Sequence, residues 1–410
     1  MFFCKIPCGP FFRGRSSEQA EGMRIMGGAE RTSKIGSNTE LYASATKITT
    51  FKHMQNTITP QHAAIGFAVL AAVLYGISSP AAKLLLESVP PALLASLLYL
   101  GAGIGMFAVS IIQSSRNKVR REAPLGKKDL PYVIGMILLD IAAPVLLMFG
   151  LSMTTAANAS LLNNFEIVTT ALVAFFVFRE AIDRRLGFAI ILIVFASILL
   201  TVEDAGSLVF SQGSILVLLA CVAWGFENNC TRMLSLKDPV EIVVIKGFGA
   251  GTGALILAFF AGEVIFSSMG SILAALMLGF FAYGLSIYFY VLAQRTLGAA
   301  RTSAFYAVAP FIGVALSFII FRTELTLSFA VATIIMILGA YFAATGGHHH
   351  KHAHTVLTHE HRHSHDDGHH THTHSPPVTD EHSHTHTHEK QVHDHPHTPD
   401  MHHHHEHERK

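Results

Sequence analysis

The chain has 410 residues, of which 50% are hydrophobic and only 14% are charged, and its formal net charge is +1 with histidine neutral. A water-soluble domain normally carries about 25% charged residues, so this composition excludes an ordinary soluble protein and indicates a lipid-solvated region. The nearly balanced charge gives no basic face of the kind that binds nucleic acid.

Residues 1–60 form a polar N-terminal extension without hydrophobic periodicity. Its first residues, MFFCKIPCGPFFRGR, lack the apolar core of about 7 to 15 residues that a signal peptide requires. We expect this extension to be disordered. Met54 begins MQNTITPQH just before the first apolar run, so translation starting at Met54 is an alternative reading of this region.

Ten apolar runs follow the extension. A bilayer-crossing helix requires about 20 mostly apolar residues, and each run is close to that length. The predicted fold class is therefore an all-α polytopic membrane protein with ten transmembrane helices. The runs lie near 63–84, 90–113, 131–151, 155–178, 186–202, 212–232, 239–261, 270–294, 298–321 and 325–345.

Lysine and arginine residues collect in alternate loops between these runs. Because such residues accumulate on the cytoplasmic side of a membrane, the alternation tests the number of spans independently. It predicts that both termini are cytoplasmic, since the opposite loops offer only Arg322. The basic residues of the cytoplasmic side are Arg116, Lys118, Arg120, Arg121, Lys127, Lys128, Arg179, Arg184, Arg185, Arg232, Lys237, Arg295 and Arg301.

The second half of the apolar region repeats the first. LYGISSP at 74–80 aligns with AWGFENN at 223–229, and GAGIG at 101–105 aligns with GAGTG at 249–253. The segment 156–180, which begins AANASLL, aligns with 299–323, which begins AARTSAF, at an offset of 143. Five helices per copy is an odd number, so the second copy enters the membrane from the opposite face. We predict two inverted five-helix repeats, 61–203 and 211–345, around a shared midplane site.

These features resemble the drug/metabolite transporter superfamily, in its EamA-like branch. The resemblance is carried by the ten spans, by the aromatic–glycine pairs Tyr75-Gly76 and Trp224-Gly225, and by the AANASLL and AARTSAF helices, and it covers residues 62–345. It implies a multi-pass transporter of a small metabolite. The N-terminal extension and the C-terminal tail do not belong to the family pattern.

Four charged residues lie well inside the predicted spans, away from their ends. At about 3 kcal/mol each for exposure to lipid, together they would cost about 12 kcal/mol, comparable to the stability of a whole domain, so we expect them to face the bundle interior. Glu166 is predicted to lie in the middle of a helix, within LLNNFEIVTT, where Asn163, Glu166 and Thr170 share one helical face. The four residues are Asp140, Glu166, Glu227 and Lys246.

In the sixth span, Trp224, Glu227 and Asn228 are spaced i, i+3 and i+4, so an aromatic ring, a carboxylate and an amide are predicted to converge. Removal of a carboxylate from water favours its protonated form, which makes Glu166 and Glu227 candidates for carrying a coupled proton. In the alternative reading these groups hydrogen-bond one helix to another and contact no ligand. The candidate solute-binding residues are Tyr75, Asn163, Glu166, Thr170, Trp224, Glu227, Asn228 and Tyr306.

Residues 346–410 form a histidine-rich tail, and 25 of the 27 histidines lie between 348 and 410. The tail has almost no apolar residues, so we expect it to be disordered. Dense His-x-His spacing suits nickel, cobalt, zinc or copper ions, although a low-complexity expansion without a selected role is the alternative. The candidate metal ligands are His348, His349, His350, His359, His361, His363, His365, His369, His370, His402, His403, His404 and His405.

The sequence therefore predicts a multi-pass plasma-membrane transporter that moves a small polar metabolite, such as an amino acid, by alternating access and carries a cytoplasmic metal-binding tail. Its expected partners are the lipid bilayer, the solute and divalent metal ions at the tail. No cofactor is required, and the formation of a homodimer stays open. An enzyme is not predicted, because no nucleophile–base pair or metal–water set is apparent. Two alternatives are a nickel, cobalt or zinc exporter fed by the tail and a non-transporting membrane sensor.

Overall fold

In the computed structural model, the described residues are 60–116, 125–178, 182–204, 209–234, 237–264, 268–297, 302, 305–345 and four strand segments of the tail. The contacts divide the chain into Met1–Thr57 and Ile58–Lys410, and the described residues all belong to the second unit. The predictions for the N-terminal extension and for the Met54 start concern residues outside this described set.

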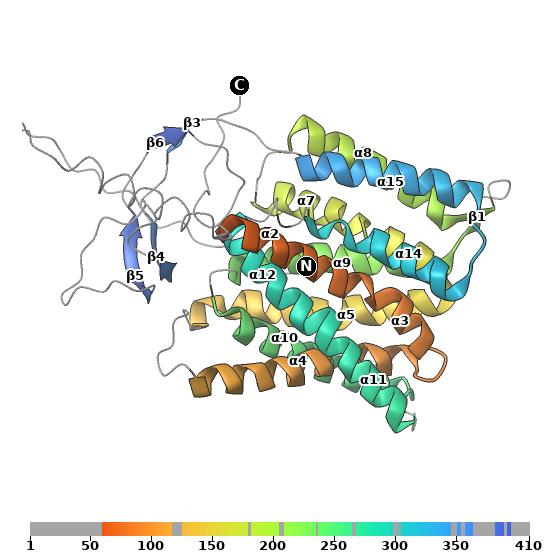
Figure 1. Cartoon of the computed structure of the whole chain (residues 1–410), viewed down its shortest axis with the longest axis horizontal. Coiled ribbons are helices and arrows are strands. Elements are labelled where there is room, and N and C mark those ends of the chain that lie inside the picture. Colours follow the sequence, from red (N-terminus) through yellow and green to blue (C-terminus); the bar gives the residue numbers. More distant parts are fainter. Residues whose placement is uncertain are drawn as a thin grey trace, which may run out of the picture. The chain divides into compact units, whose positions relative to one another are not determined.

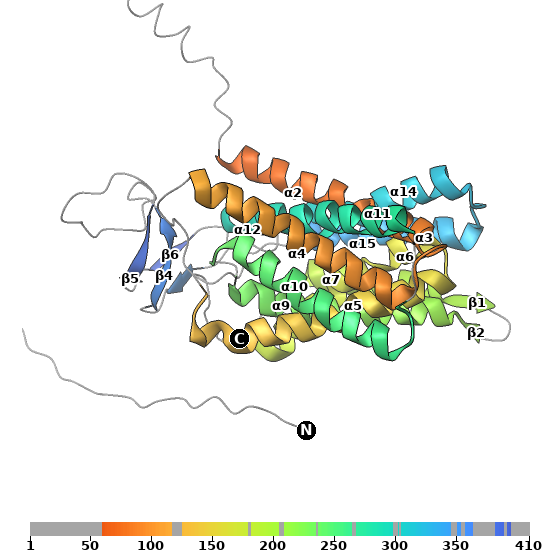
Figure 2. The same ribbon diagram turned by 90° about the horizontal axis from the view of Figure 1, so that it is seen from below.

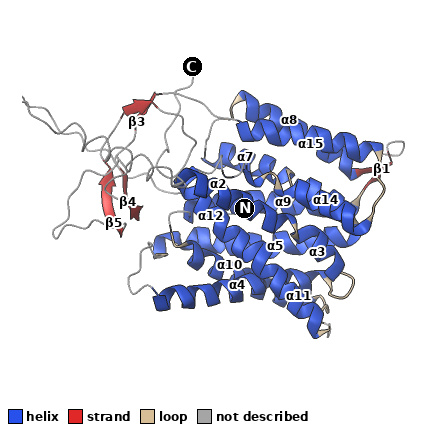
Figure 3. Ribbon diagram, viewed as in Figure 1, coloured by secondary structure: helices blue, strands red, loops and turns tan. Residues whose placement is uncertain are grey.

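The first half of the chain supplies five spans, built mostly of helix (Figure 1, Figure 3). Helices α2 (Pro60–Gly76) and α3 (Ser78–Leu85) form the first span, α4 (Pro91–Arg116) the second, the short 3-10 helix η1 (Lys127–Asp129) and α5 (Leu130–Met153) the third, α6 (Ala156–Leu162) and α7 (Phe165–Phe178) the fourth, and α8 (Arg184–Thr201) the fifth. Strands β1 (Val202–Asp204) and β2 (Val209–Phe210) pair antiparallel between the two halves.

The second half supplies the remaining spans. The sixth and seventh are α9 (Gln212–Leu234) and α10 (Pro239–Phe260). One further span consists of three consecutive helices: α11 (Met269–Gly279), the π-helix η2 (Phe280–Leu285) and α12 (Ser286–Leu297). The last two helices are α14 (Ala309–Phe321) and α15 (Leu327–Thr345).

Nine helical segments within the described residues are long and apolar enough to cross a membrane, and Ala309–Phe321 is a shorter apolar helix. Large apolar side chains cover the outside of the bundle: Phe176, Phe260 and Leu327 are 74%, 80% and 81% exposed. Lipid is the solvent in which such a surface is stable. The structure therefore confirms the prediction of a polytopic helical membrane protein, with nine or ten spans.

Two spans are interrupted where a proline follows. The ring of a helical proline clashes with the carbonyl group four residues earlier, which is Gly76 for Pro80 and Tyr306 for Pro310. Accordingly α2 ends at Gly76 and α3 begins at Ser78, whereas α14 begins at Ala309 with Pro310 in its first turn.

The fourth span is also interrupted, at Asn163 and Asn164, between α6 and α7. The amide of Asn164 donates to the Leu161 carbonyl oxygen (3.1 Å), which is a local contact that competes with helix continuation. The prediction that Glu166 lies in the middle of a helix is therefore wrong: Glu166 lies in the first turn of α7.

The two halves of the chain interdigitate rather than form separate bodies. The most extensive helix pairs are α4 with α10, α5 with α9, α8 with α15, and α2 with α12, and each pair joins one half to the other. Figure 1 and Figure 2 both show α4 beside α10 and α11. The bundle core is consequently shared by both repeats.

Polar contacts link loops at both ends of the bundle. At one end Lys237 Nζ lies 3.3 Å from Asp129 Oδ2, which joins η1 to the segment between α9 and α10. At the other end, the backbone N–H of Ala92 donates to Glu263 Oε2 (2.7 Å), which joins the start of α4 to the segment that follows α10. The carboxylate satisfies an N–H group that a helix start leaves free.

In the histidine-rich tail the structure departs from the expectation of disorder at four short strands: β3 (Lys351–Ala353), β4 (Leu357–His363), β5 (His382–His388) and β6 (Val392–Asp394). β4 pairs antiparallel with β5, and β3 pairs antiparallel with β6. Regular alternation of histidine with threonine, serine or an acid is a period-two pattern, which is compatible with a strand. Composition alone did not reveal this pairing.

Candidate solute site and buried ion cluster

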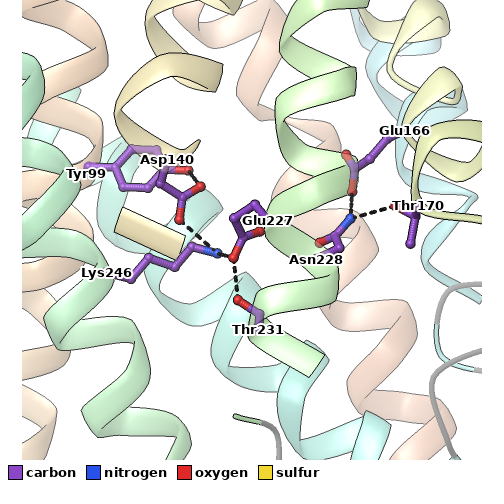
Figure 4. Close-up of polar contacts among 8 residues, drawn as sticks. All are labelled: Tyr99, Asp140, Glu166, Thr170, Glu227, Asn228, Thr231 and Lys246. Atoms are coloured by element: carbon purple, nitrogen blue, oxygen red, sulfur yellow. Dashed lines mark hydrogen bonds and ion pairs between the residues drawn. The ribbon is translucent and has the colours of Figure 1, made fainter. Parts of the chain in front are cut away.

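A polar group spans the contact between α7 and α9. The Asn228 amide donates to Glu166 Oε1 (2.6 Å) and to Thr170 Oγ1 (3.2 Å), so three of the predicted residues meet (Figure 4). Asn228, Glu166 and Thr170 are each only partly buried. The adjacent Asn229 is buried and fixes α9 by donating to the Thr170 carbonyl oxygen (3.2 Å).

Glu166, which follows the break between α6 and α7, lies in the same part of the interior as a group of tyrosine residues. Tyr75 and Tyr306 have ring centroids 5.5 Å apart, and Tyr290 contacts Tyr306 at 5.0 Å. The Glu166 carboxyl group lies within electrostatic range of the Tyr75 and Tyr306 hydroxyl groups. Discontinuous helices that expose backbone groups beside a polar cluster are typical of transporter binding sites. The carboxylate, the amide and these rings form the candidate solute site.

A second polar group, the ion cluster, lies on the other side of α9. Lys246 Nζ is 2.8 Å from Glu227 Oε1 and 3.1 Å from Asp140 Oδ2. The Tyr99 hydroxyl donates to Asp140 Oδ1 (2.9 Å), and the Thr231 hydroxyl donates to Glu227 Oε1. Asp140, Glu227 and Lys246 are 0%, 2% and 5% exposed. As expected, none of these charged groups faces lipid.

The structure separates residues that the sequence pattern had grouped. Figure 4 shows Glu227 on the side of α9 that faces Lys246, whereas Asn228 faces Glu166. The predicted convergence of Trp224, Glu227 and Asn228 on one ligand is therefore wrong for Glu227, because adjacent residues on a helix point about 100° apart. Trp224 is buried in the core cluster of apolar residues.

Asn163 also lies apart from the Glu166 group. It follows α6 as a buried residue, and its side-chain oxygen is 3.9 Å from Cys221 Sγ of α9. The helix break between Asn163 and Glu166 removes the uninterrupted helical face that the prediction assumed.

Four residues that contribute to the interior were not singled out from the sequence: Tyr99, Thr231, Tyr283 and Lys83. Thr231 was detectable, since it lies one helical turn after Glu227. Tyr283 joins Tyr75 (5.9 Å) to Tyr99 (5.4 Å), a link that depends on the tertiary arrangement. No spacing in the sequence signals it.

Lys83 performs a structural task at the opposite end of α5. Its ammonium group donates to the carbonyl oxygens of Leu151 (2.7 Å), Ser152 (3.2 Å) and Thr154 (2.9 Å). These carbonyl groups lie at the helix end, where a cation is favoured and hydrogen-bond partners are lacking. Lys83 thus joins the first span to the third.

Among the residues whose side chains the structure describes, no group of three or more His, Cys, Asp or Glu is placed to hold a metal ion. Cys221 and Cys230 are free thiols. What the interior does offer is a carboxylate–amide pair within electrostatic range of two tyrosine residues and, separately, a lysine held between two carboxylates.

Long apolar helices around a charged, aromatic interior define a polytopic helical membrane protein. A family model described as the EamA-like transporter family matches residues 62–202 and again 211–345. The chain belongs to the EamA-like transporter family, within the drug/metabolite transporter superfamily, as the sequence predicted.

Two further comparisons found similar proteins. A relative described as an uncharacterized transporter from Methanothermobacter thermautotrophicus is 26% identical over 292 residues, which cover 68% of this chain and 85% of the relative. A solved structure named "Crystal structure of protein" is similar in fold, with a TM-score of 0.50 at 18% identity, over 69% of this chain and 98% of that one.

Proposed function

We propose that this transporter moves a small polar solute that carries an amino group, such as an amino acid, across the plasma membrane by alternating access. The observation that carries this proposal is the Glu166–Asn228–Thr170 group, which lies at a helix break and within electrostatic range of Tyr75 and Tyr306. A carboxylate accepts hydrogen bonds from an ammonium group, and tyrosine faces attract cations. The amide oxygen of Asn228 offers a further acceptor.

The proposal of alternating access is supported by a symmetric pair of close helix contacts. A Cβ atom added to Gly76 would lie 2.8 Å from Ile312 Cβ, and one added to Gly225 would lie 2.5 Å from Thr169 Cβ. Thr169 and Ile312 are equivalent in the repeat alignment, and so are the two glycines. The aromatic–glycine pairs therefore mark equivalent crossings, α2 with α14 and α9 with α7.

Other helix contacts occur in the same equivalent pairs. In the repeat alignment, α2 corresponds to α9, α4 to α10, and α5 to the span that contains α11 and α12. The contact between α4 and α11 is therefore equivalent to the contact between α10 and α5. Likewise, the contact between α9 and α5 is equivalent to the contact between α2 and α12. With five spans in each copy, such an arrangement fits two repeats inserted in opposite directions. Exchange of conformation between the two copies would open the shared site to each side in turn.

The test is a thermal-shift screen of amino acids and related metabolites on purified full-length protein, followed by uptake of the stabilising solute into proteoliposomes. We expect Glu166→Gln to weaken binding about 10- to 100-fold, because a hydrogen bond to a charged group contributes about 1.5–3 kcal/mol. Glu87→Gln is the matched control, since Glu87 is exposed. Flat uptake across the panel, or equal losses in both variants, contradicts the proposal.

We propose in addition that the tail lies in the cytoplasm and binds divalent nickel, cobalt, zinc or copper ions. The support is the strand register: His359 pairs with His386, His361 with His384 and His363 with His382, and His352 pairs with His393 in the other ladder. Three residues separate β3 from β4, and three separate β5 from β6. The β3–β6 ladder therefore continues the antiparallel register of the β4–β5 ladder. Cross-strand partners lie about 4.5–5.5 Å apart, and imidazole suits these metal ions.

Metal stoichiometry on the full-length protein tests the tail. His361→Ala combined with His384→Ala removes one cross-strand pair, whereas His369→Ala combined with His370→Ala removes two histidines outside the described strands. We expect the first variant to lose more high-affinity Zn²⁺ or Ni²⁺ in isothermal titration calorimetry. Equal losses would show that the register has no part in binding.

A further inference from the structure

The ion cluster contains more negative than positive charge. Asp140 and Glu227 are two carboxylates, and Lys246 is the single ammonium group between them. With all three ionised, the cluster has a net charge of −1 in a site where its members are nearly inaccessible to water. A buried uncompensated charge is unfavourable, and addition of one proton makes the cluster neutral.

Within the part of the chain that the structure describes, the titratable and charged side chains found near Asp140 and Glu227 leave this imbalance in place. Tyr99 of α4 and Lys246 of α10 contact Asp140, and Tyr283 of η2 lies within electrostatic range of it. Around Glu227 the further groups in range are Cys230 of α9 and Glu166 of α7. Lys83 of α3 binds carbonyl groups at the far end of α5.

The hydrogen bonds indicate which oxygen has room for the proton. Lys246 donates to Glu227 Oε1, which also receives the Thr231 hydroxyl, and Tyr99 donates to Asp140 Oδ1. Asp140 Oδ2 is fully buried and, apart from the Lys246 ammonium at 3.1 Å, has no polar partner among the described residues.

We propose that the ion cluster is a binding site for one exchangeable proton, which is held mainly on Asp140 Oδ2. A proton from water forms an O–H bond with the Asp140 carboxylate, Lys246 stays an ammonium ion paired with Glu227, and the cluster becomes neutral. Loss of that proton to water restores the shared ion pair. This site is distinct from Glu166, which faces the candidate solute site.

Helix α9 connects the proton site to the solute site. Glu227 and Asn228 are consecutive residues, and one contacts Lys246 while the other contacts Glu166 (Figure 4). Any shift of α9 that follows the change of charge therefore moves the Asn228 amide as well. Coupling of the proton to solute movement rests on the proposed function, whereas proton binding itself does not.

The molecule carries its own reporter. Trp224 is the single tryptophan of the chain and lies one helical turn before Glu227. We would titrate its fluorescence from about pH 5 to about pH 9 in purified full-length protein and in the Asp140→Asn variant. We expect one protonation step in the unsubstituted protein and its loss in Asp140→Asn, because Lys246 and Glu227 then balance. Asp129→Asn, an aspartate paired with Lys237 near the end of the bundle, should retain the step.

Two further measurements keep the proposal falsifiable. If Asp140→Asn does not fold, Glu227→Gln replaces it, since it also leaves one carboxylate for one ammonium group. Titrations with sodium chloride and with choline chloride separate protons from metal cations, and a response to sodium at fixed pH overturns the proton assignment. A flat curve in the unsubstituted protein, or an unchanged step in both variants, also overturns it. Failure of the solute screen with the step intact would reject the solute proposal alone.

Discussion

At the scale of single residues, the bundle interior uses its charged side chains in two ways. Lys83 satisfies backbone carbonyl groups at the end of α5, whereas Lys246 is held between carboxylates from α5 and α9. In the first case removal of the charge leaves polar groups that retain partial access to water. In the second it leaves two buried carboxylates without their counter-ion, so the two lysines should respond differently to neutralisation.

We expect Lys246→Met to destabilise the protein by about 3–5 kcal/mol, because breaking a buried ion pair leaves an uncompensated charge. Thermal unfolding in detergent measures this as a lower melting temperature. Addition of Asp140→Asn and Glu227→Gln to Lys246→Met should restore much of the loss, since no unpaired charge then stays buried. Lys127→Met, at an exposed position in η1, is the control and should change the melting temperature little. Absence of rescue would show that Lys246 contributes through packing alone.

The charged residues of the interior were predictable, because an acid or a lysine within an apolar run is visible in the sequence and costs too much to face lipid. Their partners were less predictable. Asn228 contacts Glu166 and Thr170, a pairing that its spacing from Trp224 and Glu227 did not specify, whereas Glu227 faces Lys246. Tyr99 lies in the predicted span 90–113, which contains no charged residue. Long-range pairing depends on how helices cross, and helical spacing does not contain that information.

At the scale of elements, interruptions of helices bring polar groups to the middle of the bundle. Pro80 and Pro310 account for the breaks after Gly76 and before Ala309, because each proline ring clashes with the carbonyl group four residues earlier. The signal for both breaks was therefore present in the sequence. The break at Asn163 and Asn164 was not, because paired asparagines lower helix propensity only slightly. Spans read from hydropathy alone therefore appear more continuous than the structure has them.

Close packing of α4 against α11 depends on small residues, and it yields a prediction with an internal control. A Cβ atom on Gly101 would lie 2.1 Å from the Leu276 carbonyl oxygen, so Gly101→Ala should force the helices apart at a cost of about 1–3 kcal/mol. Gly66 has no atom within 4 Å of an added Cβ, so Gly66→Ala should be neutral or stabilising by up to about 1 kcal/mol. The measurement is the melting temperature of each variant, which should fall for Gly101→Ala and not for Gly66→Ala. Equal changes in the two variants would contradict close packing of α4 against α11 at Gly101.

At the scale of the whole molecule, the interdigitation of the two halves has a consequence for stability. Because the major helix pairs join one repeat to the other, neither half retains its core alone. We therefore attribute folding to the assembled bundle rather than to independent halves. Such an arrangement also requires that loops joined by contacts lie on the same side of the membrane, as Lys237 with Asp129 and Glu263 with the start of α4 illustrate.

The proposed opposite insertion of the repeats predicts the outcome of accessibility labelling. In a background with all four cysteines replaced, Lys128→Cys and Val209→Cys place single thiols at η1 and at β2, between the two halves. We expect a membrane-impermeant maleimide added to intact cells to label Val209→Cys and to spare Lys128→Cys until the membrane is opened, because basic loops stay in the cytoplasm. Three predicted spans lie between the two positions. The two thiols therefore lie on opposite sides of the membrane if all three spans cross it. Labelling of both thiols from one side would remove a span from the first half, and the inverted repeat and its shared midplane site would be lost with it.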